Sequence, residues 1–189
     1  MSKLYNKAEQ FVIDSFNNID KPHQIKHFIR TAYWVKQLEP NSDEALLIAA
    51  VAHDIERAFR QKDILEKKYL VNELEFLRPH EERGAEIIAK FLKKEGAKKE
   101  LINKIKMLVS RHEEGGNTDQ NLLKDADSIS FFENNVKFFF EGELLKLFGK
   151  ENVKKKLDWM YNRITSKKAK EIVGAWYSKS IKALAEIPE

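Results

Sequence analysis

Apolar residues recur at spacings of three and four along almost the whole chain, and no segment has the apolar–polar alternation of a half-buried strand. Seven glycines and four prolines in 189 residues are also too few for the many tight turns of an all-β protein. Neither an internal repeat nor a low-complexity linker divides the chain. The sequence therefore predicts a single all-α domain over residues 1–189, long enough to bury a sizeable core.

Capping residues, prolines and glycines set the expected helix boundaries. Asn41, with Glu44 three residues later, fits a capping box. Pro79 suits the first position of a helix, and Asp119 could cap another. Residues 55–78 are polar, basic and only partly helical in pattern. Helices are expected at about residues 3–17, 23–38, 42–53, 66–77, 79–95, 98–112 and 120–132, followed by about three more that divide at Gly149 and Ser166 and end near Ala185.

Charge and cysteine content narrow the classes of partner and compartment. The formal net charge is +4, but the 34 basic residues interleave with 30 acidic ones, and the densest clusters, Lys154–Lys156 and Lys167–Lys170, are expected on solvated helix faces. A nucleic acid polymer is therefore not favoured as a partner. The absence of cysteine excludes disulfides, zinc–thiolate sites and iron–sulfur clusters.

The hydropathy pattern gives no sign of a membrane segment. The longest apolar run, Ala45–Ala52, is far shorter than the roughly 20 residues that a bilayer-spanning helix needs. The first residues are too charged for a secretory signal. We therefore expect a cytoplasmic protein that does not bind membranes.

The histidines carry the candidate chemistry of the chain. His53, His80 and His112 each lie in register with an apolar helix face and at a helix end, so they should point into the core. A buried imidazole needs a partner, and one metal ion can satisfy several. Asp54 follows His53 after the apolar run, and an ionised carboxylate there needs a cation. The residues alone favour a metal site over scattered core and surface histidines.

Five short motifs also occur in order along the chain: HFIR at 27–30, LIAAVAHDI at 47–55, HEERGA at 80–85, His112, and LLKDAD at 122–127. Together they resemble the successive motifs of the HD-domain superfamily of metal-dependent phosphohydrolases. The resemblance covers residues 27–127. It implies an HD-type helical bundle at about residues 20–132, with residues 133–189 as a C-terminal helical extension.

The resemblance assigns the family's metal ligands to particular residues of this chain. His27 matches the first histidine of the pattern, and His53 and Asp54 match its His-Asp doublet. Asp127 matches the final aspartate. Asp125 is the alternative, because residues two apart on a helix point about 160° apart and only one of them can face the metal.

Two intermediate histidines, His80 and His112, decide how many metal ions are expected. Family members that have both often hold two ions bridged by the doublet aspartate; otherwise these histidines line the pocket or bind phosphate. Nitrogen and oxygen ligands without sulfur admit Mn, Fe, Co, Ni, Zn or Mg, one or two per chain. His23, one turn before His27, could support a ligand or touch substrate, although a capping or surface role is favoured.

The implied activity is hydrolysis of a small phosphate ester, with a nucleotide as the favoured substrate, by metal-activated water. Asp54 would orient the metal and the water, and Arg57 would bind the phosphate. Lys124, one turn from Asp127, is a further candidate, whereas Arg60, Arg78 and Arg83 are more simply solvated rim charges. The alternatives are a di-iron oxygenase on the same site and a non-catalytic nucleotide-binding module.

Aromatic residues are concentrated after the last motif, at Phe131–Phe132, Phe138–Phe140, Trp159 and Trp176. They could form a pocket wall that stacks on a nucleobase. Core packing, or the face of a helical homodimer, is the favoured explanation.

Overall fold

The computed structural model describes residues 2–60, 74–141 and 143–187. Within these ranges all regular structure is helical and no strand occurs, which confirms the all-α prediction. Residues 66–73 of the helix expected at 66–77 lie outside the described residues. The α-helices are α1 (Lys3–Asn17), α2 (Ile25–Leu38), α3 (Glu44–Ala52), α4 (Leu74–Lys94), α5 (Lys99–Val109), α6 (Thr118–Ser130), α7 (Val136–Glu141), α8 (Glu143–Phe148), α9 (Lys150–Asn162) and α10 (Lys167–Glu186).

Shorter helical turns complete the fold. Pro22–Gln24 and Ile55–Ala58 are 3₁₀ turns that precede α2 and follow α3. Phe131–Asn135 is a π-helical segment that joins α6 to α7. None of the described helices is both long and apolar enough to cross a bilayer.

The central element is α3, whose residues from Ala45 to Ala52 are all buried. A helix that is apolar on every side needs neighbours all round, and α1, α2, α5 and α6 contact α3. Their buried side chains form a first core that extends to Ala126 on α6.

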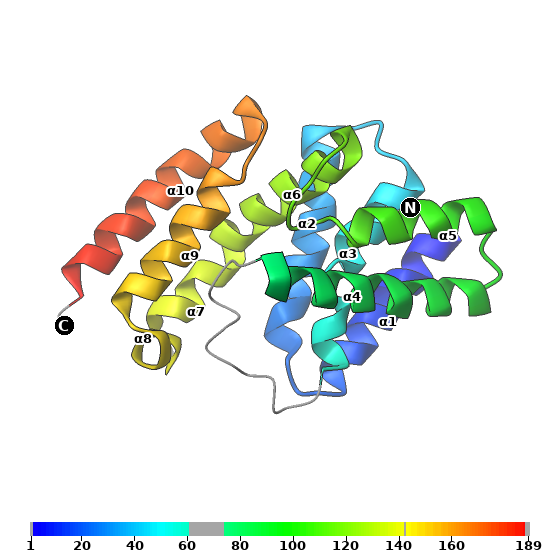
Figure 1. The fold of residues 1–189 in the computed structure, drawn as a ribbon, viewed down its shortest axis with the longest axis horizontal. Helices are drawn as coiled ribbons and strands as arrows, with labels where there is room; N and C mark the ends of the chain where they lie inside the picture. The colour runs from blue at the N-terminus through cyan, green and yellow to red at the C-terminus, as the bar shows by residue number, and fades with distance from the viewer. Residues whose placement is uncertain (1, 61–73, 142, 188–189) are drawn as a thin grey trace.

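A second core begins one turn further along α6, at Ile129, and includes buried side chains of α9 and α10. In Figure 1, α9 and α10 lie on one side of α6 and α2, while α4 and α5 lie on the other side. The division between the two cores falls close to the expected end of the motif-bearing part at residue 132. Helix α6 contributes buried residues to both cores, and α2 packs against both through Trp34 and Leu38.

Two predicted helix caps were each wrong by two residues. Asp43, not Asn41, caps α3, because its carboxylate accepts the N–H of Leu46 at 3.0 Å while residues 39–42 form a turn. Asn117, not Asp119, caps α6 and forms a capping box with Gln120. Both true caps stand immediately before the first helical residue, where the unpaired N–H groups lie.

Pro79 does not begin its helix: α4 starts at Leu74 and carries Pro79 inside it. Proline fits the first turn best because the N–H groups there have no helical partner. Here it comes soon after that turn, where its missing N–H removes a single backbone hydrogen bond. The start of α2 also differs, since His23 belongs to the preceding 3₁₀ turn.

The segment between α5 and α6 is a turn rather than the end of a helix. We expected a helix to His112, but α5 ends at Val109. Gly115 has φ +78°, which residues with a Cβ rarely adopt, and a Cβ atom there would lie 2.2 Å from Oδ1 of Asn121, so glycine is favoured at this position. This turn leads His112 into the interior.

Candidate metal centre

Four histidines and three carboxylates meet in the interior of the molecule, and each is at most 6% exposed. They come from five elements that lie far apart in the sequence. Helix α2 supplies one histidine, the end of α3 a His-Asp pair, α4 a histidine, the turn after α5 a His-Glu pair, and α6 an aspartate. In chain order they are His27, His53, Asp54, His80, His112, Glu113 and Asp127.

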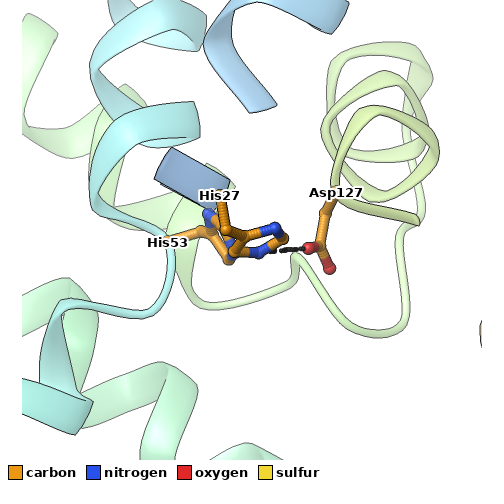
Figure 2. A group of neighbouring side chains, drawn as sticks. All are labelled: His27, His53 and Asp127. Atoms are coloured by element: carbon orange, nitrogen blue, oxygen red, sulfur yellow. Dashed lines mark ion pairs between the residues drawn. The ribbon is translucent and has the colours of Figure 1, made fainter. Parts of the chain in front are cut away.

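One group of possible metal ligands is formed by His27, His53 and Asp127. Oδ1 of Asp127 lies 3.0 Å from Nε2 of His27 and 3.4 Å from Nε2 of His53. Figure 2 shows the two imidazoles side by side with the Asp127 carboxylate of α6 facing them. These are the residues that the resemblance assigned to the first histidine, the doublet histidine and the final aspartate.

Two further groups continue from the first, His53 with Asp54 and His112, and His80 with His112 and Glu113. Oδ1 of Asp54 lies 3.6 Å from Nδ1 of His80 and 3.7 Å from Nε2 of His112. Oε1 of Glu113 lies 3.5 Å from Nε2 of His80. The three groups overlap, so the site is a continuous row of donors with Asp54 at its middle.

The backbone hydrogen bonds of two imidazoles leave their other ring nitrogens, which could ligate a metal, directed into this row. Nδ1 of His53 is 2.9 Å from the carbonyl oxygen of Ala50, and Nδ1 of His112 is 2.8 Å from that of Val109. If each Nδ1 carries the proton, each Nε2 presents its lone pair, which is how protein backbone commonly orients metal-binding histidines.

Several of these donor atoms are buried and have no hydrogen-bond partner in the described protein. They are Nε2 of His53, Nε2 of His112, both ring nitrogens of His80, and Oδ1 of Asp54. Leaving such atoms unpaired costs about 1–3 kcal/mol each. A divalent metal would satisfy them together, so the residues present fit a metal ion.

The charges at the site also suit metal binding. Burial lowers the pKa of His27 and of His80, which favours the neutral ligand form. Burial acts to raise the pKa of Asp54, but the Arg57 guanidinium and neighbouring imidazoles outweigh it and hold that pKa well below its usual range. Asp127 behaves in the same way, with Arg163 as its main counter-charge.

His112 differs from the other histidines. Burial acts to lower its pKa, but the carboxylates around it, Asp54, Glu113 and Glu81, outweigh burial and raise the pKa to about 9. Glu81 also holds the turn in place, because its Oε1 accepts the backbone N–H of Glu113 at 2.8 Å. Ligation through Nε2 of His112 would therefore release a proton.

A pocket of about 240 Å³ adjoins this row of donors. His27, Asp54 and Asp127 line it together with Arg57 and Lys156. Its aromatic lining consists of Phe28 and Phe131 from the motif-bearing part and Phe138, Phe139 and Phe148 from the extension. Phe131 and Phe132 are buried in the second core, whereas Phe138 and Phe139 are only partly buried, and Phe139 also packs against that core.

The structure places the two predicted phosphate-binding residues differently. Arg57 lines the pocket, and its Nε lies 2.8 Å from Oδ2 of Asp54. Lys124 is not among the residues that line this pocket. Its ammonium donates to the carbonyl oxygen of Glu114 at 3.4 Å and to Oδ1 of Asn121 at 3.3 Å, so the side chain reaches back over the α5–α6 turn.

Asp125 faces away from the metal centre. Its two oxygens accept the backbone N–H groups of Thr165 and Ser166 at 2.7 and 2.8 Å. Of the two aspartates it is therefore Asp127 that joins the donors. His23 is exposed and belongs to no donor group; it lies at the pocket beside Phe138, with ring centroids 5.3 Å apart.

The remaining arginines of this region serve mainly in ion pairs. Arg60 and Arg83 both pair with Glu56, and Arg78 pairs with Glu114. Of these three arginines only Arg60 lines the pocket.

Sequence reasoning missed three residues at the site. Glu113 follows His112 as Asp54 follows His53, and this second doublet could have been noticed. Lys156 was assigned to a solvated cluster, although it lines the pocket. Arg163 pairs with Glu113 and Asp127.

The comparisons with known proteins identify the family but no activity. No curated protein and no solved structure matches the chain. A family model described as "Domain of unknown function (DUF4202)" matches residues 6–184. This range includes every residue of the donor row and every buried residue of the two cores except Tyr5, so the chain belongs to the DUF4202 family.

Proposed function

We propose that this protein is a metal-dependent phosphohydrolase of the HD-domain type that acts in the cytoplasm on a small phosphate ester, with a nucleotide as the favoured substrate. The observation that carries the proposal is the buried row of imidazoles and carboxylates, several of whose atoms have no hydrogen-bond partner. This row lies beside a pocket that is also lined by the cationic side chains of Arg57 and Lys156.

The donor row can be divided between one or two ions. His27, His53 and Asp127 would hold an ion at one end, and His80, His112 and Glu113 at the other, with Asp54 between them. A bound divalent ion lowers the pKa of water and neutralises phosphoryl oxygens. In the absence of sulfur ligands, Mn, Fe, Co, Ni, Zn and Mg all remain admissible.

Arg57 and Lys156 would bind the phosphate from two different elements, the 3₁₀ turn after α3 and helix α9. The planar fork of arginine suits phosphate oxygens, and lysine supplies a point charge. Asp54 faces Arg57 on one side and the imidazoles on the other. In this arrangement Asp54 would orient both the metal and the attacking water.

The aromatic wall supports a nucleotide among possible phosphate esters. Phe138, Phe139 and Phe148 present ring surfaces to the same pocket as the cations. Stacking of a base on an aromatic side chain contributes about 1–3 kcal/mol and tolerates different bases. Ring surfaces near phosphate-binding cations match a molecule that is flat at one end and anionic at the other.

The test begins with metal content, measured by inductively coupled plasma mass spectrometry on anaerobically purified, tag-free protein. Phosphate release from a panel of nucleoside mono-, di- and triphosphates follows, with each metal added in turn. We expect one or two equivalents of metal, and both metal and turnover should be lost in His53→Ala. His23→Ala is the matched control and should keep its metal. No binding after reloading would refute the proposal.

The same samples separate the two alternatives. A row of four histidines and three carboxylates could also hold two irons. Iron as the main metal, with substrate-dependent oxygen uptake and no phosphate release, would indicate an oxygenase. Nucleotide binding without turnover under any metal would indicate a binding module.

A further inference from the structure

One buried arginine from the extension contacts both ends of the donor row. Arg163 directly follows α9, and its side chain is only 6% exposed. Its two terminal nitrogens pair with Glu113 and Asp127, and its Nε donates to Oγ of Ser128 at 2.9 Å. All three guanidinium nitrogens therefore have partners.

Each of these carboxylates divides its two oxygens between the arginine and the imidazoles. Oδ2 of Asp127 accepts a hydrogen bond from Arg163, and Oδ1 lies 3.0 Å from Nε2 of His27. Oε2 of Glu113 accepts a hydrogen bond from Arg163, and Oε1 lies 3.5 Å from Nε2 of His80. A single planar group thus fixes the orientation of two carboxylates that belong to opposite ends of the row.

We propose that Arg163 is a positioning residue that sets the two terminal carboxylates of the metal centre, so that the C-terminal extension completes the site. This inference rests on the proposed metal site. Partners that orient metal ligands in this way typically account for about 10- to 100-fold in metal affinity. Lysine could not replace the arginine, because one ammonium lacks the rigid fork that reaches two carboxylates at once.

The rest of α9 supports this role. Lys156, Met160 and Arg163 recur at spacings of four and three, which places them on one face of the helix. The first two line the pocket, and the third contacts the donors. Trp159 stacks on Arg163, with the guanidinium carbon 4.5 Å from the ring centroid. One face of α9 therefore contributes to the pocket and to the metal centre.

The experiment compares Co²⁺ binding by the full-length wild type and by Arg163→Lys and Arg163→Gln. Each apo protein is titrated with Co²⁺, and the visible absorption of the bound ion reports its ligand arrangement. Metal retained after gel filtration gives the stoichiometry. We expect both variants to bind Co²⁺ about 10- to 100-fold more weakly, with an altered absorption spectrum.

Asp125→Ala is the matched control, because Asp125 also ties α6 to the segment after α9 but touches no donor. It should leave the Co²⁺ spectrum unchanged. Arg163→Lys keeps the buried charge, so it serves as the test variant if Arg163→Gln does not fold, as judged by circular dichroism.

The possible failures are distinguishable. If the wild type binds no Co²⁺, both the proposed function and this inference fail. If the wild type binds Co²⁺ and the Arg163 variants match it in affinity and spectrum, the inference alone is refuted. If Asp125→Ala reproduces the whole change, the effect comes from loosening the extension, and the positioning role is again refuted.

Discussion

Replacement of Arg57 by alanine tests the phosphate-binding half of the site. The Arg57 side chain is 42% exposed at the pocket, and its Nε is 2.8 Å from Asp54. Because an ion pair with so exposed a partner is solvent-screened, its loss should cost at most about 1 kcal/mol of stability. For a chain of this length that lowers the melting temperature by about 2–4 °C.

The expected kinetic effect is much larger. A hydrogen-bonded charge on a phosphate oxygen contributes about 1.5–3 kcal/mol. Since about 1.4 kcal/mol corresponds to a factor of ten, kcat/KM should fall roughly 10- to 100-fold in Arg57→Ala. The assay is steady-state phosphate release on the best substrate of the panel, with metal content measured on the same sample. Metal content should stay at the wild-type level.

Arg83→Ala is the matched control. Arg83 is similarly exposed, at 50%, and pairs with a buried carboxylate, Glu56, but it does not line the pocket. Its removal should leave kcat/KM within about twofold of wild type. Unaltered kinetics in Arg57→Ala, or an equal loss in Arg83→Ala, would show that Arg57 does not bind the phosphate.

Three further predictions concern stability and pH. Metal at 100 times its dissociation constant should stabilise the wild type by about 2.7 kcal/mol, which scanning fluorimetry would record as a rise of several degrees in melting temperature; a similar rise in His53→Ala would contradict the site. Burial lowers the pKa of Lys156 to about 8, so its positive charge is present below that pH and lost above it. Inhibition by inorganic phosphate should therefore weaken as pH rises through about 8, and Lys156→Met should remove this dependence, which a competition assay across pH would detect. Gly115→Ala should cost about 1–3 kcal/mol in chemical denaturation, because the new Cβ would meet Oδ1 of Asn121 at 2.2 Å and the backbone has φ +78°; an unchanged midpoint would contradict this.

Local patterns predicted most of the fold because helix signals are local. The span of α1 was predicted correctly, since apolar spacing and the turn after Asn17 both mark it. The errors at Asn41, Pro79 and Asp119 share one cause. Each residue suits a helix start, but such local signals place the end of a helix only to within a few residues.

The site was predictable only in part, because its residues lie far apart in the sequence. Helix register indicated that His53, His80 and His112 point inward. Helix register also indicated that Asp125 and Asp127 point in different directions. It did not indicate which of the two faces the histidines. Arg163 lies 50 residues after Glu113, and no local pattern connects positions so far apart.

The charge balance of the site supports phosphate as its ligand. Among the described residues, the carboxylates of Asp54, Glu113 and Asp127 are balanced by Arg57, Arg163 and Lys156 once His112 is in the neutral form that ligates a metal. Charge alone therefore creates no need for a metal; the unpaired lone pairs of buried imidazoles do. A divalent ion held by neutral histidines would leave the centre with an excess of positive charge. Under the proposed function, a dianionic phosphate monoester in the adjoining pocket would cancel the excess left by one ion.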